Sequence, residues 1–92
     1  IRDCLLIKCD QMLMGIPQDE ILKVIQYRYE DKKNIFHSIN TDIIEYNNEL
    51  VPIVNLSDLL LINKIASESK DINLVLIGNQ IKKVALCVDT IL

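Results

Sequence analysis

The chain has 92 residues, of which half are apolar and only 4% are aromatic, and its net charge is −3. This length predicts one small domain with a dense aliphatic core. The acidic balance and the scarcity of aromatic side chains argue against nucleic-acid binding. No apolar run approaches the ~20 residues that span a bilayer, and no signal-peptide pattern opens the chain, so we expect no membrane insertion. Three cysteines without a Cys-x-x-Cys motif indicate reduced thiols rather than a disulfide framework.

The beginning of the chain predicts a β-hairpin followed by a short helix. Residues 4–9 and 12–16 are mostly apolar, and Asp10-Gln11 between them suits a turn. Gly15 inside the second strand indicates a bulge or a close backbone approach. Pro17 ends this strand, and the apolar stripe at positions 21, 22, 24 and 25 predicts a short helix or helical turn over residues 18–25.

The next segment predicts two weak strands separated by a charged turn. Residues 27–29 alternate as in an exposed strand, and residues 30–33 are all charged, which is typical of a solvated turn. Residues 35–39 predict a weak strand around His37. This is the only histidine of the chain, and we expect it at the surface.

A hairpin in the middle of the chain has the clearest turn chemistry. We expect strands over residues 42–46 and 49–55, joined by Asn47-Asn48, because Asn tolerates the left-handed backbone conformation of tight turns. Pro52 cannot donate to a ladder, which predicts an edge strand or a bulge. Ser57-Asp58 is an acceptable N-cap for a Leu-rich helix over residues 58–64.

The end of the chain predicts a polar loop and a third hairpin. Residues 66–71 are polar and are interpreted as a mobile loop, and residues 72–77 and 80–89 form strands on either side of Gly78-Asn79. Three hairpins and two short helical segments predict an all-β, barrel-like fold and argue against a parallel α/β sheet. Nothing in the sequence closes the last strand before Leu92, which predicts truncation or a strand donated by a partner.

Residues with the chemistry of a catalytic or metal site are scarce. A single histidine has no carboxylates or cysteines at ligand spacing around it, and two isolated glycines exclude a phosphate-cradling loop. Val88-Asp89-Thr90 resembles the start of the Asp-Thr-Gly motif of a dimeric aspartic protease, but Ile91 occupies the position of the required glycine. We therefore expect no enzyme activity, no catalytic residue, no cofactor and no metal.

The order of the motifs resembles the CheW-like domain of bacterial chemotaxis. The shared motifs are a hairpin ending in Gly-Ile-Pro, then Ile-x-x-Val-Ile, then Leu-Val-Pro-Ile-Val-x-Leu before a short helix, and a late strand ending in Leu-x-Val-Asp. The resemblance covers almost the whole chain. It implies a fold of two small SH3-like β-barrels within a single domain over residues 1–92. It also implies further strands after Val88-Asp89, so we expect the chain to be C-terminally incomplete.

The resemblance also implies where this domain binds other proteins. The family's Val and Glu after Ile-Pro correspond to Ile21 and Lys23, and the family's Gly and Arg in the central hairpin correspond to Asp42 and Asn47. Asn48 replaces a second Gly of the same motif. The family's Glu and Arg are thus both absent, so we expect the binding surface, rather than the fold, to differ from the family.

The function that the resemblance implies is a non-catalytic adaptor of chemotaxis signal transduction. Such a scaffold couples the cytoplasmic tip of chemoreceptors to a CheA-type histidine kinase and binds other CheW-like domains, in the cytoplasm at membrane-associated receptor arrays. The alternative is a regulatory CheW-like domain inside a CheA-type kinase. A generic β-barrel scaffold and a dimeric aspartic protease are further alternatives.

Overall fold

The computed structural model describes residues 3–28, 35–61 and 71–92 of the chain. Within these ranges, β-strands dominate, with one 3-10 turn and one four-residue α-helix. In chain order the elements are β1 (Cys4–Cys9), β2 (Met12–Pro17), the 3-10 turn η1 (Gln18–Glu20), β3 (Ile21–Arg28), β4 (Ile35–His37), β5 (Asp42–Tyr46), β6 (Glu49–Asn55), α1 (Leu56–Leu59), β7 (Asp71–Gly78), β8 (Lys83–Val88) and β9 (Thr90–Ile91).

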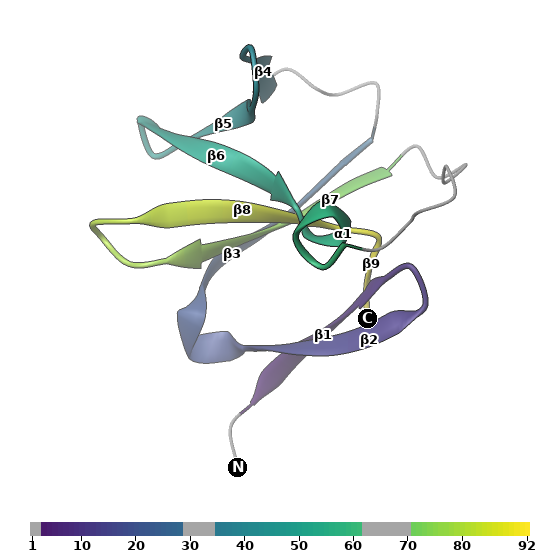
Figure 1. The fold of residues 1–92 in the computed structure, drawn as a ribbon. Helices are drawn as coiled ribbons and strands as arrows, with labels where there is room; N and C mark the ends of the chain where they lie inside the picture. The colour runs from purple at the N-terminus through teal and green to yellow at the C-terminus, as the bar shows by residue number, and fades with distance from the viewer. Residues whose placement is uncertain (1–2, 29–34, 62–70) are drawn as a thin grey trace.

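The strands form two sheets. The smaller sheet has the order β2-β1-β9 and the larger one the order β3-β7-β8-β6-β5-β4 (Figure 1). All pairs are antiparallel except β6 and β8, which are parallel. The larger sheet curls into a half-barrel, so the predicted all-β class with a short helix and a barrel-like shape is confirmed.

All three predicted hairpins are present. β1 pairs with β2, β5 with β6 and β7 with β8 in continuous antiparallel register. Asn47 and Asn48 both have positive φ angles, of 48° and 63°. This is the conformation of the two-residue turn that matches the twist of a hairpin, and it confirms the prediction from the Asn-Asn pair.

Two hydrophobic cores lie on the two faces of β7. Leu74 and Leu76 point into the half-barrel, where they pack with Ile44, Val51 and Ala85. The alternate residue Val75 points to the other face, and its cluster contains residues of β1, α1 and β8, which are, in chain order, Ile7, Cys9, Leu56, Leu86 and Val88. Side chains alternate between the two faces of a strand. The apolar residues of β7 therefore pack into the core of the half-barrel on one face and into the core shared with the smaller sheet on the other.

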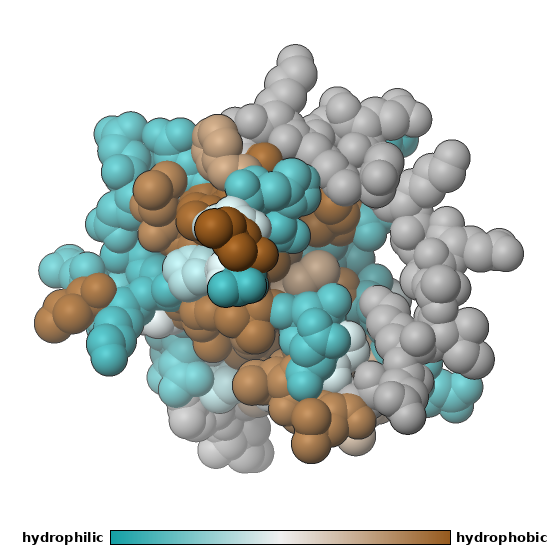
Figure 2. Space-filling view, turned by 45° about the horizontal axis from the view of Figure 1, so that its top comes forward, coloured by the Kyte–Doolittle hydropathy of each residue, from teal (hydrophilic) through white to brown (hydrophobic). Residues whose placement is uncertain are grey.

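Some large apolar side chains remain at the surface. Figure 2 shows hydrophobic side chains interspersed with hydrophilic ones on the face that it presents. Among the described residues, the most exposed large apolar side chains are Ile39, Leu61 and Ile81, and Leu50 is also well exposed. Single exposed apolar side chains are normal. They indicate a contact surface only where several of them lie close together.

Of the short helix or helical turn predicted over residues 18–25, only a turn at Gln18–Glu20 is present, and the prediction is wrong for residues 21–25. Only η1 is helical there, and β3 begins at Ile21 and pairs with β7 along its length, with a register shift between Ile21 and Lys23. The apolar positions 21, 22, 24 and 25 fit a helical stripe, but the β-branched side chains among them also favour a strand. Pairing with the buried strand β7 decides between the two.

Two details of the central region also differ from the prediction. β6 is an inner strand between β8 and β5, so Pro52 is not on an edge, but the ladder to β8 begins only at Ile53. The helix begins at Leu56 rather than residue 58, and its N-cap is Asn55, whose side chain accepts the backbone N–H of Ser57. The helix ends at Leu59, so residues 60 and 61 of the predicted helix are not helical. Residues 62–64 of the predicted helix, the turn at residues 30–33 and the loop at residues 66–70 lie outside the described residues.

Asp89 joins the two sheets at the point where the chain passes from β8 to β9. Its carboxylate accepts the backbone N–H of Asp10 in the β1–β2 turn, and its backbone N–H donates to the Lys8 carbonyl at 3.1 Å. Its own carbonyl accepts a hydrogen bond of 2.8 Å from the side chain of the buried residue Asn73. Asn73 in turn accepts a hydrogen bond from Gln26. The side chain that resembles part of a protease motif is thus engaged in structural hydrogen bonds.

Replacing Asp89 with alanine should lower the free energy of unfolding by about 0.5–1.5 kcal/mol, because the exposed hydrogen bond between the Asp89 carboxylate and the Asp10 N–H is lost. Asp89→Asn keeps an acceptor oxygen and should lose clearly less. Urea denaturation followed by circular dichroism measures both changes. Asp3→Ala, at an exposed aspartate near the N-terminus, serves as the control. Equal losses for Asp89→Ala and Asp3→Ala would contradict a joining role for Asp89.

Candidate protein-binding site

A β-bulge in β3 places Lys23 at one end of the half-barrel, which we call its mouth. Ile21 lies opposite Ile77 but Lys23 lies opposite Leu76, so Leu22 is the extra residue of β3. Cross-strand partners share a face, which places Lys23 on the same face as the buried Leu76. The bulge therefore directs a charged side chain towards the end of the barrel core.

The Lys23 ammonium lies over the ring of Tyr46, with Nζ 5.9 Å from the ring centroid. β3 and β5 are not neighbours in the sheet, so the curl of the sheet is what brings these two side chains together. Tyr46 is half-buried and packs against the core of the half-barrel. A cation over an aromatic ring at an exposed site contributes about 0.5–1 kcal/mol. The contact joins β3 and β5, the first and fifth strands of the half-barrel, across its mouth.

Asn47 follows Tyr46 directly and is exposed in the β5–β6 turn. Its φ of 48° belongs to the left-handed region, which Asn adopts more readily than most residues. Its exposed amide has both donor and acceptor capacity. Lys23, which lies over the half-buried Tyr46 ring, and Asn47, which follows Tyr46 in the chain, are both exposed, and we call these three residues the mouth cluster.

The other two predicted binding residues lie elsewhere. Asp42 is at the opposite end of β5, about 17 Å from Asn47 for five residues of extended chain. There its carboxylate contacts His37 Nδ1 at 2.7 Å on the exposed β4–β5 hairpin. Ile21 is half-buried and packs against the core between the two sheets. Of the four predicted residues, Lys23 contacts Tyr46, the residue before Asn47, whereas Asp42 lies at the other end of β5.

Tyr46 is the member of the mouth cluster that no sequence pattern indicated. It lies in the predicted strand, but no spacing rule relates it to Lys23, 23 residues earlier in the chain.

Across residues 3–28, 35–61 and 71–92, no three or more His, Cys, Asp or Glu side chains gather as a metal site would require. Nor does a helix within these ranges have the length and apolarity to cross a membrane.

An exposed cluster of side chains on a curled sheet with two apolar cores is characteristic of a small protein-interaction domain. A family model of the CheW-like domain matches residues 3–92, so the chain belongs to the CheW-like domain family, a family of non-catalytic scaffolding domains. The aspartic protease alternative is thereby excluded, in agreement with the structural hydrogen bonds of Asp89.

A solved structure has the same fold. It is the scaffolding protein TtCheW from Thermoanaerobacter tengcongensis, which is 17% identical to this chain and superposes with a TM-score of 0.74. The match covers 99% of this chain and 62% of the TtCheW chain, so the present chain spans less than two thirds of the length of that scaffold. Among curated proteins, no sequence match was found.

Proposed function

We propose that this chain acts as a scaffold that couples the cytoplasmic tips of chemoreceptors to a CheA-type histidine kinase. Membership of the CheW-like family supports this role. Its partners would be the kinase, the receptor tip and other CheW-like domains, which places the protein in the cytoplasm at membrane-associated receptor arrays. The observation that supports the proposal is the contact of Lys23 with Tyr46, because the resemblance aligns Lys23 and Asn47 with the family's Glu and Arg, and Tyr46 directly precedes Asn47.

The chemistry of the mouth cluster indicates a changed binding preference. The family's Glu and Arg are opposite charges that would support an ion pair, whereas here a lysine contacts an aromatic ring and an amide replaces the guanidinium. The partner surface opposite Lys23 should carry a carboxylate, because like charges brought together at an interface cost affinity. We therefore expect weak binding to a receptor tip that suits the family's usual charges.

The combined variant Lys23→Glu with Asn47→Arg should restore family-like receptor binding. We expect an affinity about tenfold or more above that of the unchanged protein, since charge pairs across an interface are worth about 1.5 kcal/mol or more. Isothermal titration of the full protein with a soluble receptor-tip fragment measures this change, and a second titration with the kinase regulatory domain tests the scaffold role itself.

Lys8→Glu is the control for the Lys23→Glu part of the variant, because it makes the same charge reversal at an exposed residue of β1. Arginine is less tolerant than asparagine of the positive φ at position 47, so thermal unfolding should accompany each titration. An unchanged receptor affinity in a folded double variant would remove Lys23 and Asn47 from the contact. Absence of binding to both the kinase domain and the receptor tip by the full protein would refute the proposed function.

A further inference from the structure

A groove separates the ends of two hairpins in the larger sheet. β6 and β8 pair only where Ile53–Asn55 lies beside Ala85–Cys87, and towards their N-terminal ends the two strands diverge (Figure 1). The groove between them has a volume of about 630 Å³, and its lining includes Leu50, Ile77, Ile81 and Val84. Its walls are the β5–β6 hairpin on one side and the β7–β8 hairpin on the other.

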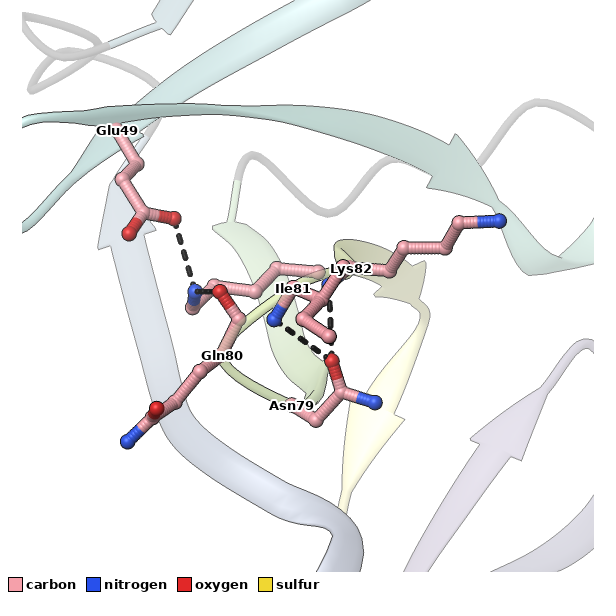
Figure 3. A network of polar contacts seen from close by, with 6 residues as sticks. Glu49, Asn79, Gln80, Ile81 and Lys82 are labelled. Atoms are coloured by element: carbon pink, nitrogen blue, oxygen red, sulfur yellow. Dashed lines mark hydrogen bonds and ion pairs between the residues drawn. The ribbon is translucent and has the colours of Figure 1, made fainter.

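The β7–β8 turn holds an apolar side chain outwards at this groove. Gly78 has a φ of 133°, and the Asn79 side chain accepts the backbone N–H groups of Ile81 and Lys82 at 2.8 and 2.9 Å (Figure 3). This well-bonded turn leaves the Ile81 side chain 89% exposed, and Leu50 on the facing hairpin is 68% exposed. These two exposed aliphatic side chains line the same groove, whereas exposed apolar side chains that are scattered singly need no explanation.

The charges along the groove do not cancel. Lys83 Nζ lies 2.8 Å from Glu49 Oε2 and 3.3 Å from the Gln80 carbonyl oxygen, so this pair is internally neutralised (Figure 3). The neighbouring Lys82 is exposed, and its ammonium has no partner among the described residues. Within the part of the chain that the structure describes, one positive charge without a partner therefore lies beside the apolar walls, and a carboxylate is its complement.

The backbone of β8 also faces the groove. Asn79 donates its N–H to the Lys82 carbonyl at 2.9 Å, while the Lys82 N–H is donated to the Asn79 side chain, so one backbone hydrogen bond joins these two residues at the end of the ladder. Bonded and non-bonded pairs alternate along an antiparallel ladder, and Lys83 is the next residue along β8. Its N–H and C=O are consequently directed away from β7, towards β6. An extended segment can use such groups for main-chain hydrogen bonds.

We propose that this groove docks an extended segment of a partner protein that carries a large aliphatic side chain beside a carboxylate. The aliphatic side chain lies between Leu50 and Ile81, and the carboxylate pairs with Lys82. The proposal goes beyond the scaffold role and does not depend on the mouth cluster. Leu50 alternates with the inward-facing Val51, so it projects from the opposite face of the sheet to Lys23.

The test uses the full protein and two fluorescein-labelled peptides in fluorescence anisotropy. One peptide reads Thr-Val-Glu-Leu-Glu-Val-Thr, and the other has lysine in place of both glutamates. We expect the acidic peptide to bind about tenfold or more tightly than the basic one, and Leu50→Ser and Ile81→Ser each to weaken its binding about fivefold or more. Lys82→Glu should reverse the preference between the two peptides.

Ile39→Ser is the matched control, because Ile39 is an isoleucine of similar exposure, 96%, that lies outside the groove lining. Its peptide affinity should be unchanged, and so should that of the variant Lys23→Glu with Asn47→Arg. No saturable binding of the acidic peptide up to about 1 mM, equal binding of both peptides, or equal losses for Ile81→Ser and Ile39→Ser would each overturn the proposal. A failed receptor titration with intact peptide binding would contradict only the scaffold role.

Discussion

Replacing Gly78 with alanine is expected to lower the free energy of unfolding by about 2–4 kcal/mol, a large loss for a single methyl group. Gly78 has a φ of 133°, which L-residues with a side chain rarely adopt. A Cβ atom there would lie 2.1 Å from the Lys82 carbonyl oxygen and 2.9 Å from Lys83 Cα. Because both neighbours are backbone atoms of the same hairpin, the turn must rearrange. Urea denaturation followed by circular dichroism measures the loss.

Gly15→Ala provides the matched control for Gly78→Ala. Gly15 lies in β2 without a positive φ, and a Cβ atom there would meet Cys4 Cβ at 3.3 Å. This close approach is one of the two alternatives that the sequence predicted for Gly15, and the continuous register of β1 and β2 excludes the bulge. A small side-chain shift can relieve the contact, so we expect a loss within about 1 kcal/mol. Similar losses at both glycines would show that the backbone of the β7–β8 turn is not strained by a side chain.

Leu74→Ala is the second change with a large expected effect, a loss of about 2–5 kcal/mol in the free energy of unfolding. Leu74 is fully buried at the centre of β7, where it lies opposite Ile25 of β3 and Cys87 of β8. Removing its branched end leaves a cavity among strands that are paired on both sides and have little freedom to close it. Chemical denaturation should show a lower midpoint with an unchanged dependence on denaturant concentration.

Leu50→Ala removes the same atoms from an exposed position and is the control for Leu74→Ala. The Leu50 side chain lines the groove rather than a core, so its loss should change stability by less than about 0.5 kcal/mol. A comparable effect of the two leucine variants would contradict the assignment of Leu74 to the core of the half-barrel. Because Leu50→Ala should remain folded, it also separates stability from binding at the groove.

The local signals in the sequence were sufficient for the hairpins but not for β3. Asn47-Asn48 adopts the backbone conformation that only a few residue types accept, so the turn and the register of its two strands follow from neighbouring residues alone. Positions 18–25 have no such turn signal, and an apolar stripe there fits either a helix or a strand. The partner that makes it a strand is β7, about 50 residues later in the chain.

Pro52 shows the same limit at an inner strand. Its missing N–H predicted an edge strand or a bulge, but β6 is an inner strand and Pro52 pairs with Ile43 in continuous register, and only the pairing with β8 is broken there, beginning at Ile53. An edge strand is the usual cause of such a break. Here the cause is the divergence of β6 and β8, which also opens the groove beside Leu50. A single strand cannot reveal how far its neighbour diverges from it.

The all-β class, the three hairpins and the family resemblance could be predicted from the amino-acid sequence, because turn chemistry and apolar alternation act over a few neighbouring residues. Which surface residues meet, in contrast, depends on the tertiary fold. Lys23 reaches Tyr46 because a bulge at Leu22 and the curl of a six-stranded sheet bring β3 and β5 together. Asp42 and Asn47 are close in sequence, yet an extended strand holds them at opposite ends of β5. Such distances depend on pairing between strands that are far apart in the sequence, and no local sequence pattern predicts that pairing.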